Sequence, residues 1–100
     1  MLLKQGIHTS DAARDARSDM GLWLRSLREQ QGMSQRDLAN ALKLDYYTFI
    51  SQLENGRGRI PPARYRDWAA ALQVEPRSFV KKLLSYNEPL TYEILFGDAV

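Results

Sequence analysis

The chain has 100 residues, of which 44% are apolar and none is cysteine, and it carries a net charge of +2. This length and apolar content predict one soluble domain with a single core. The sequence contains no run of about 18 apolar residues, which excludes a membrane-spanning helix. The absence of cysteine excludes disulfides and thiolate-bound metals. The start, M-L-L-K-Q-G-I-H, lacks the apolar core of a signal peptide, so we expect a cytoplasmic protein.

Charge is unevenly distributed along the chain. Between Leu22 and Lys82 there are 11 Lys or Arg residues against 6 Asp or Glu residues. The segment after Lys82 contains acidic residues and no base. A basic central segment favours binding to a polyanion, and the alternative is that these charges only solvate the surface.

The first part of the chain divides into an arm and a helix. Residues 1–19 are small and polar without apolar periodicity, so we expect a flexible N-terminal arm. A folded domain is predicted over residues 20–85. Its first helix is predicted to begin after Asp19 as N-cap and to run to about Gln31, ending at Gly32. The apolar stripe of this helix comprises Trp23, Leu24 and Leu27.

Two short helices joined by a tight turn are predicted between residues 33 and 61. Ser34 is the expected N-cap of the first, and Asp37 stands where a capping box has its acidic residue. The turn is expected at Lys43 and Leu44. The second helix is predicted to follow Asp45 or Tyr46 as its N-cap. The expected buried residues are Leu38, Ala39, Leu42, Phe49 or Ile50, and Leu53.

The second of these helices is predicted to end at Asn55–Gly56, because glycine takes the positive φ of a helix C-cap at no steric cost. A fourth helix is expected after Pro61 or Pro62. It is interrupted by Val74 and Pro76, and a fifth follows at about residues 77–85. Residues 86–100 form a C-terminal extension with an apolar element at residues 88–96. The expected core residues of these last helices are Tyr65, Trp68, Ala69, Leu72, Phe79, Val80, Leu83 and Leu84.

The combined pattern is that of a known family. Residues 24–39 read L-R-x-L-R-E-x-x-G-M-S-Q-x-x-L-A, and residues 50–56 read I-S-Q-L-E-N-G. With I-P before helix four and W-A-x-A-L within it, the chain resembles the lambda-repressor-like, XRE-type helix-turn-helix family. The resemblance implies an all-α fold, a five-helix lambda-repressor-like DNA-binding domain, here with a short C-terminal helical extension. The stretch around Lys43–Tyr46 is one residue longer than usual, so either the turn is longer or helix three begins earlier.

The resemblance implies that helix three, at about residues 46–55, enters the major groove of double-stranded DNA. Its expected base-contacting residues are Tyr47, Thr48, Ser51 and Gln52. Glutamine bonds adenine bidentately, and threonine contacts a thymine methyl or a base edge. Tyr46 and Tyr47 alternatively pack within the turn. The expected phosphate-contacting residues are Gln35, Arg36, Tyr46, Asn55, Arg57 and Arg59, with Lys43 as a further candidate.

Arg28 and Glu54 have a different expected role. In the family, the matching Arg and Glu form an ion pair that ties helix one to the end of helix three, so we expect a structural pair here. Catalysis is not expected, because the sequence has one histidine, no cysteine and no phosphate-binding glycine loop after a strand. We therefore predict neither an enzyme nor any cofactor or metal ion.

A specific operator usually needs two such modules, so we expect a homodimer. The apolar segment from Lys82 to Phe96 is the candidate dimerisation surface, and the alternative is that it folds back on its own chain. The predicted function is a sequence-specific transcriptional regulator of prokaryotic type, acting as a dimeric repressor. Two alternatives use the same fold: an antitoxin with a toxin as protein partner, and a protein-interaction module that has lost DNA binding.

Overall fold

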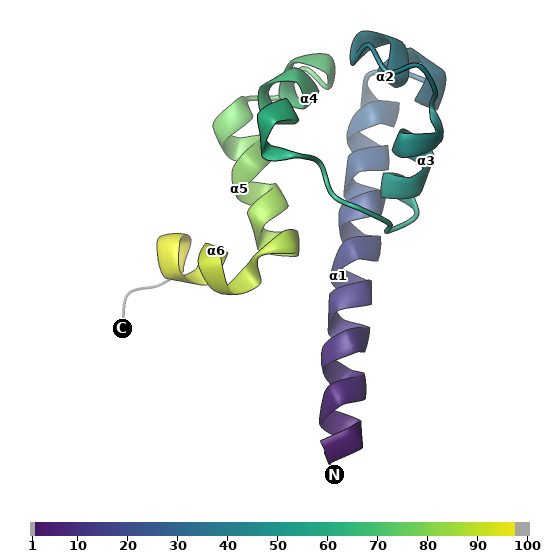
Figure 1. The fold of residues 1–100 in the computed structure, drawn as a ribbon. Helices are drawn as coiled ribbons and strands as arrows, with labels where there is room; N and C mark the ends of the chain where they lie inside the picture. The colour runs from purple at the N-terminus through teal and green to yellow at the C-terminus, as the bar shows by residue number, and fades with distance from the viewer. Residues whose placement is uncertain (1, 98–100) are drawn as a thin grey trace.

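The computed structural model describes residues 2–97, with side chains from residue 11 onward. The described chain is helical throughout: α1 (Leu2–Gln30), α2 (Gln35–Ala41), α3 (Thr48–Glu54), the 3₁₀ turn η1 (Pro62–Arg64), α4 (Tyr65–Ala71), α5 (Pro76–Asn87) and α6 (Pro89–Phe96). The upper half of α1 lies between α3 on one side and α5 on the other, while its lower half extends beyond the other helices (Figure 1). The predicted all-α fold is confirmed.

The core lies where α1, α3, α4 and α5 meet. Its fully buried side chains are Met20, Leu24, Leu38, Leu42, Ile50, Leu53, Ile60, Trp68, Leu72, Phe79 and Leu83. Trp68 is 2% exposed, which confirms its predicted core role. Trp23 is only half buried and stacks on Phe79 with 5.4 Å between ring centroids, so it joins α1 to α5. Burial of such aromatic pairs dominates the stability of small cores.

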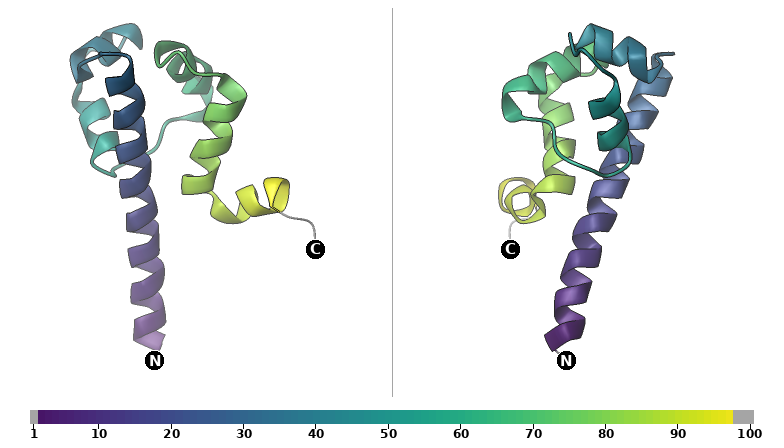
Figure 2. Two further views of the ribbon diagram at one scale, coloured as in Figure 1. Left: turned by 180° about the vertical axis from the view of Figure 1, so that it is seen from behind. Right: turned by 45° about the vertical axis from the view of Figure 1, so that its right-hand side comes forward.

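The start of α1 differs from the expected arm. We predicted a flexible segment over residues 1–19 and a helix beginning at Asp19, but one continuous helix runs from Leu2 to Gln30. Residue 1 lies outside the described residues. Three alanines and an Asp11–Arg14 ion pair favour helix here. Apolar periodicity reports burial, so it gives no signal for a helical segment that projects into solvent, as the two further views show (Figure 2).

Close backbone contact sets the angle between α1 and α3. A Cβ atom placed on Gly21 would lie 2.4 Å from the carbonyl oxygen of Glu54, so only glycine allows this approach. One turn earlier, Ser18 lies beside Gly56, which has φ +80° as the C-cap prediction requires. The sequence analysis missed Gly21, because a glycine within a helix carries no signal of what packs against it.

The helices after the motif lie close to their predicted positions. Helix α4 is preceded by η1, which starts at Pro62, and α5 is longer than expected at both ends, running from Pro76 to Asn87. Glu75 caps α5 by accepting hydrogen bonds from the backbone N–H groups of Arg77 and Ser78. The apolar extension forms α6, and residues 98–100 of the expected extension lie outside the described residues. Within residues 2–97, no helix has the length and apolarity needed to cross a bilayer.

Candidate nucleic-acid interface

Local hydrogen bonds define where α2 begins. The hydroxyl of Ser34 accepts a hydrogen bond from the Asp37 N–H at 3.0 Å, and the Asp37 carboxylate accepts one from the Ser34 N–H at 2.9 Å. This reciprocal pair is the capping box expected from the sequence, completed by Asp in place of the longer Glu. The hydrogen bond from the Ser34 backbone N–H lowers the pKa of the Asp37 carboxyl, with a further contribution from the Ser34 side chain.

The turn between α2 and α3 is longer than usual. Lys43 has φ +58°, and the N–H groups of Lys43 and Leu44 donate to the carbonyls of Asn40 and Ala39. These two bonds form a Schellman C-cap, in which Lys43 occupies the left-handed position that favours glycine. Helix α3 then begins at Thr48 with Tyr47 as its N-cap, rather than after Asp45 or Tyr46 as predicted. Helix α3 therefore begins later in the chain than predicted.

The seven residues of α3 separate into an inner and an outer face. Ile50 and Leu53 are fully buried, and Glu54 beside them is 8% exposed. Thr48 and Gln52, one turn apart, are exposed on the opposite face, with Ser51 half buried beside them. Three of the four predicted base-contacting residues therefore share one outward surface. The fourth, Tyr47, is 42% exposed at the N-terminal end of the helix.

A buried ion pair connects the helices of the motif. Arg28 donates from Nε and Nη2 to the two carboxylate oxygens of Glu54, at 2.7 and 2.9 Å, and from Nη1 to the Met33 carbonyl at 2.7 Å. The hydrogen bonds to Glu54 raise the pKa of Arg28, although burial opposes them. The predicted pairing of these residues is present, and it joins α1, the α1–α2 turn and the end of α3.

Gln35 is part of the same network, a role that the sequence analysis missed. Its side-chain amide donates to the Glu54 carboxylate at 3.1 Å. An amide nitrogen has two N–H donors, so this bond uses one and leaves the other for an acceptor outside the protein. The start of α2 is thereby fixed to the end of α3, which sets the relative position of the two helices.

Cationic and polar side chains surround the outer face of α3. The Arg36 guanidinium lies 5.4 Å from the ring centroid of Tyr47, and Tyr46 is 78% exposed. Asn55 and Arg57 are both exposed just beyond the C-terminal end of α3. Arg36 and Arg57 thus lie near opposite ends of a short helix whose outer surface is polar. Such a surface suits a phosphate-lined groove.

Arg59 is separate from this group. Its Nη1 donates to the Glu88 carboxylate at 2.8 Å, and its Nη2 donates to the Asn87 carbonyl at 3.3 Å. These contacts direct the side chain towards the junction of α5 and α6. We predicted a phosphate contact for Arg59, and that stays a prediction; here its guanidinium is engaged by Glu88 and the Asn87 carbonyl. The prediction rested on the closeness of Arg59 to Arg57 in the sequence. Gly58 between them has φ +81°, so the chain changes direction there.

Comparisons with known proteins identify relatives of this arrangement. A family model described as Helix-turn-helix matches residues 24–79, more than half of the chain. Among solved structures, the restriction-modification controller protein C.AhdI from Aeromonas hydrophila is similar, with a TM-score of 0.56 and 32% sequence identity. The alignment covers 65% of this chain and 96% of that one. A comparison with curated proteins found no match.

The family match and the similarity to a controller protein support a DNA-binding transcriptional regulator. The chain belongs to the helix-turn-helix family, matched over residues 24–79, and the XRE-type resemblance seen in the sequence is confirmed. This family consists of DNA-binding regulators rather than enzymes. The match includes none of residues 1–23, and it ends at residue 79, before most of α5 and all of α6.

Proposed function

We propose that the protein is a dimeric, sequence-specific repressor that inserts α3 into the major groove. The observation that carries this proposal is the division of α3: Ile50, Leu53 and Glu54 anchor the helix, while Thr48 and Gln52 are exposed one turn apart on its other side. Anchored residues fix the helix position, and polar side chains on its free face are the groups that read base edges.

Base recognition is assigned to Tyr47, Thr48, Ser51 and Gln52. Gln52 has the strongest case, because its exposed amide matches the donor and acceptor pattern of adenine in the major groove. The position of Tyr47 beside Arg36 favours contact with the edge of the groove over a packed role in the turn, since 42% of its surface is free.

Phosphate binding is assigned to Gln35, Arg36, Tyr46, Asn55 and Arg57. Arg36 precedes the recognition helix and Arg57 follows it, so together they position α3 along the groove without reading sequence. Arg59 is left out of this set, because its ion pair with Glu88 would have to break before it could bind phosphate. The similarity to a restriction-modification controller protein makes promoters of neighbouring restriction and modification genes the first DNA to test.

Two substitutions test the division between base and phosphate contacts. Gln52→Ala should reduce the discrimination between bases at one base pair by about 1–3 kcal/mol. Arg57→Ala should lower the affinity for all DNA sequences alike, and should reduce the slope of log affinity against log salt concentration by about one unit. Arg59→Ala serves as the matched control, because its paired guanidinium should contribute little to the slope. Binding titrations with selected and scrambled duplexes at several salt concentrations measure all three. An unchanged site preference and affinity for Gln52→Ala would show that the assigned face of α3 is wrong.

A further inference from the structure

Helix α6 has an apolar outer face that is left open to solvent. Leu90 is 72% exposed, Ile94 75% and Leu95 61%. Leu90 and Ile94 are four residues apart, so they lie on one side of the helix. Helix α6 packs against α5, where the Lys81 ammonium lies 4.8 Å from the ring centroid of Phe96. Large apolar side chains exposed side by side on a helix favour an interaction surface.

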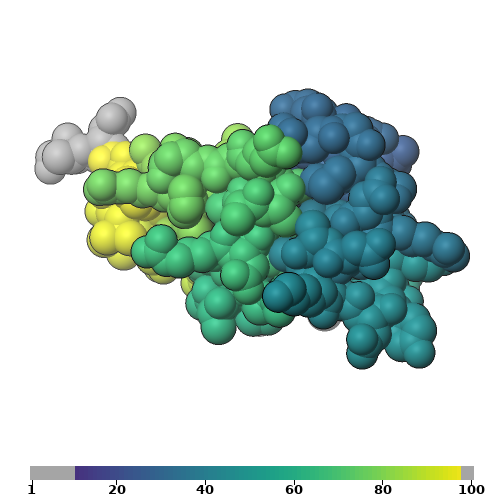
Figure 3. Space-filling view, turned by 90° about the horizontal axis from the view of Figure 1, so that it is seen from above, coloured from purple at the N-terminus to yellow at the C-terminus, as the bar shows by residue number. Residues whose placement is uncertain are grey.

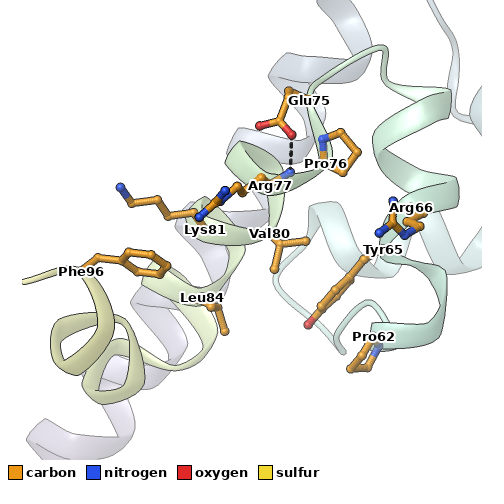
Figure 4. Close-up of a pocket in the computed structure, with 10 residues that line it drawn as sticks. All are labelled: Pro62, Tyr65, Arg66, Glu75, Pro76, Arg77, Val80, Lys81, Leu84 and Phe96. Atoms are coloured by element: carbon orange, nitrogen blue, oxygen red, sulfur yellow. Dashed lines mark hydrogen bonds between the residues drawn. The ribbon is translucent and has the colours of Figure 1, made fainter.

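A cleft of about 720 Å³ lies beside this helix, between the start of α4 and one side of α5 (Figure 4). Its apolar lining comes from Tyr65, Val80 and Leu84, and Phe96 of α6 closes one end. The close-up shows Tyr65 and Val80 facing each other across the hollow, with Phe96 at the far side next to Lys81. The cleft is therefore apolar inside and continuous with α6.

The rim of the cleft is basic. Arg66, Arg77 and Lys81 line it together with a single carboxylate, that of Glu75, so three positive charges meet one negative charge, a net of +2. The Glu75 carboxylate is already engaged by backbone N–H groups at the start of α5. Among residues 11–97, none of the three cations forms an ion pair. The rim therefore suits an acidic partner surface.

The outer face of α6 has the matching chemistry. Glu93 is exposed beside Ile94 and, within the described part of the chain, has no ion-pair partner. A helix that presents leucine and isoleucine next to a carboxylate fits a cleft with an apolar lining and a cationic rim. Both surfaces belong to the same chain, and opposite charges on facing surfaces favour docking in one orientation.

We propose that this cleft receives the outer face of α6 from a second copy of the chain, so that each of two protomers docks its α6 into the other. Phe96 belongs both to α6 and to the cleft wall, so the donated and the receiving surfaces are continuous, as a two-fold interface requires. Seen from above, α6 lies at the opposite end of the molecule from α2 and α3, so docking leaves the recognition helix free (Figure 3). The inference rests on the proposed homodimer and assigns its interface.

The absence of cysteine makes this interface directly testable by cross-linking. Two full-length variants, Ile94→Cys on α6 and Arg66→Cys on the cleft rim, are purified separately and mixed in equal amounts with a short thiol-reactive cross-linker. Both positions are exposed, so the substitutions should leave the fold intact. The mixture should give covalent dimers at least tenfold faster than either variant alone. Leu22→Cys, exposed on α1, is the control position and should not link to Arg66→Cys.

A second measurement separates the interface from dimerisation itself. Sedimentation of the native chain should show a dimer, and Ile94→Asp should raise its dissociation constant at least tenfold. Self-linking of Ile94→Cys without linking to Arg66→Cys would overturn docking in the cleft while keeping a dimer through α6. A dimer that neither cysteine links and Ile94→Asp leaves unchanged would place the interface elsewhere. A native chain that stays monomeric at all concentrations would overturn the proposed homodimer and this inference with it.

Discussion

Removing the charge of Glu54 should destabilise the fold far more than it alters any contact with DNA. In Glu54→Gln the side chain keeps its shape, but the Arg28 guanidinium, which is 8% exposed, loses its counter-ion. Arginine cannot escape by deprotonation, because its pKa lies far above neutral pH even without a counter-ion. Leaving one member of a buried pair unpaired costs about 3–5 kcal/mol.

The size of this loss can also be estimated from the hydrogen bonds. Of the two bonds between Arg28 and the carboxylate, at 2.7 and 2.9 Å, one becomes a bond to the neutral amide oxygen and the other is lost, because the amide NH2 group cannot accept it. Each bond to a charged group contributes about 1.5–3 kcal/mol, which agrees with the range for a broken buried pair. Small domains have a total stability of about 5–15 kcal/mol. A loss of this size should therefore lower Tm by roughly 12–40 °C, at 4–8 °C for each kcal/mol.

Thermal and urea unfolding followed by circular dichroism measure this effect. The matched control is the double variant Arg28→Met/Glu54→Leu, which removes both charges and should recover much of the lost stability, because no buried charge then lacks a partner. DNA affinity, measured well below Tm, should fall little in either variant. Loss of DNA binding by Glu54→Gln at unchanged Tm would refute the structural role and place Glu54 at the DNA contact.

Three further changes test other parts of the structure. Gly21→Ala should destabilise by about 1–3 kcal/mol in urea unfolding despite the better helix propensity of alanine, because its Cβ would meet the Glu54 carbonyl oxygen at 2.4 Å. Lys43→Gly should stabilise by about 0.5–1 kcal/mol, since relief of the positive φ exceeds the added chain entropy. Capping hydrogen bonds lower the pKa of both Asp37 and Glu75 in the folded state. The stabilisation by these ionised carboxylates is therefore complete above the unfolded-state pKa values near 4, and it is lost as pH falls through the lower folded-state values.

Each of these predictions has a matched control. Leu22→Ala, one residue from Gly21 but exposed, should leave stability nearly unchanged. Asn40→Gly, inside α2, should cost about 0.3 kcal/mol, opposite in sign to Lys43→Gly. The double variant Asp37→Asn/Glu75→Gln should lose less stability than the native chain between pH 6 and about pH 3. The reasoning would be contradicted if Lys43→Gly and Asn40→Gly changed stability in the same direction. It would also be contradicted if the stability of the double variant and that of the native chain changed equally with pH.

The motif could be predicted from the sequence because several local signals agree there. Ser34 and Asp37 identify the start of α2 on chemical grounds, and Gly56 identifies the end of α3. The spacing of Leu38, Ile50 and Leu53 identifies the buried faces. Family resemblance added the Arg28–Glu54 pair, which lies 26 residues apart and has no local signal.

The features that the sequence did not predict depend on contacts between distant segments, or on a segment that has few such contacts. Lys43 takes its positive φ at a position where the resembled family usually has glycine, and the hydrogen bonds of the turn hold it there. The long start of α1 has no apolar stripe to reveal it. Arg59 was predicted to bind phosphate from its place in the chain, but its guanidinium is paired with Glu88, the residue between α5 and α6. Pairing between distant segments is the information that one sequence does not supply.

Selection of bound duplexes from a randomised DNA pool, done with the native chain and with Gln52→Ala at two salt concentrations, tests the central claim most directly. If the protein binds specific sequences as a dimer, the selection should enrich an inverted repeat with half-sites about 10 base pairs apart. Gln52→Ala should then lose preference at symmetric positions in the two half-sites. Enrichment of no sequence by the native chain, with binding that disappears at the higher salt, would contradict sequence-specific recognition through α3.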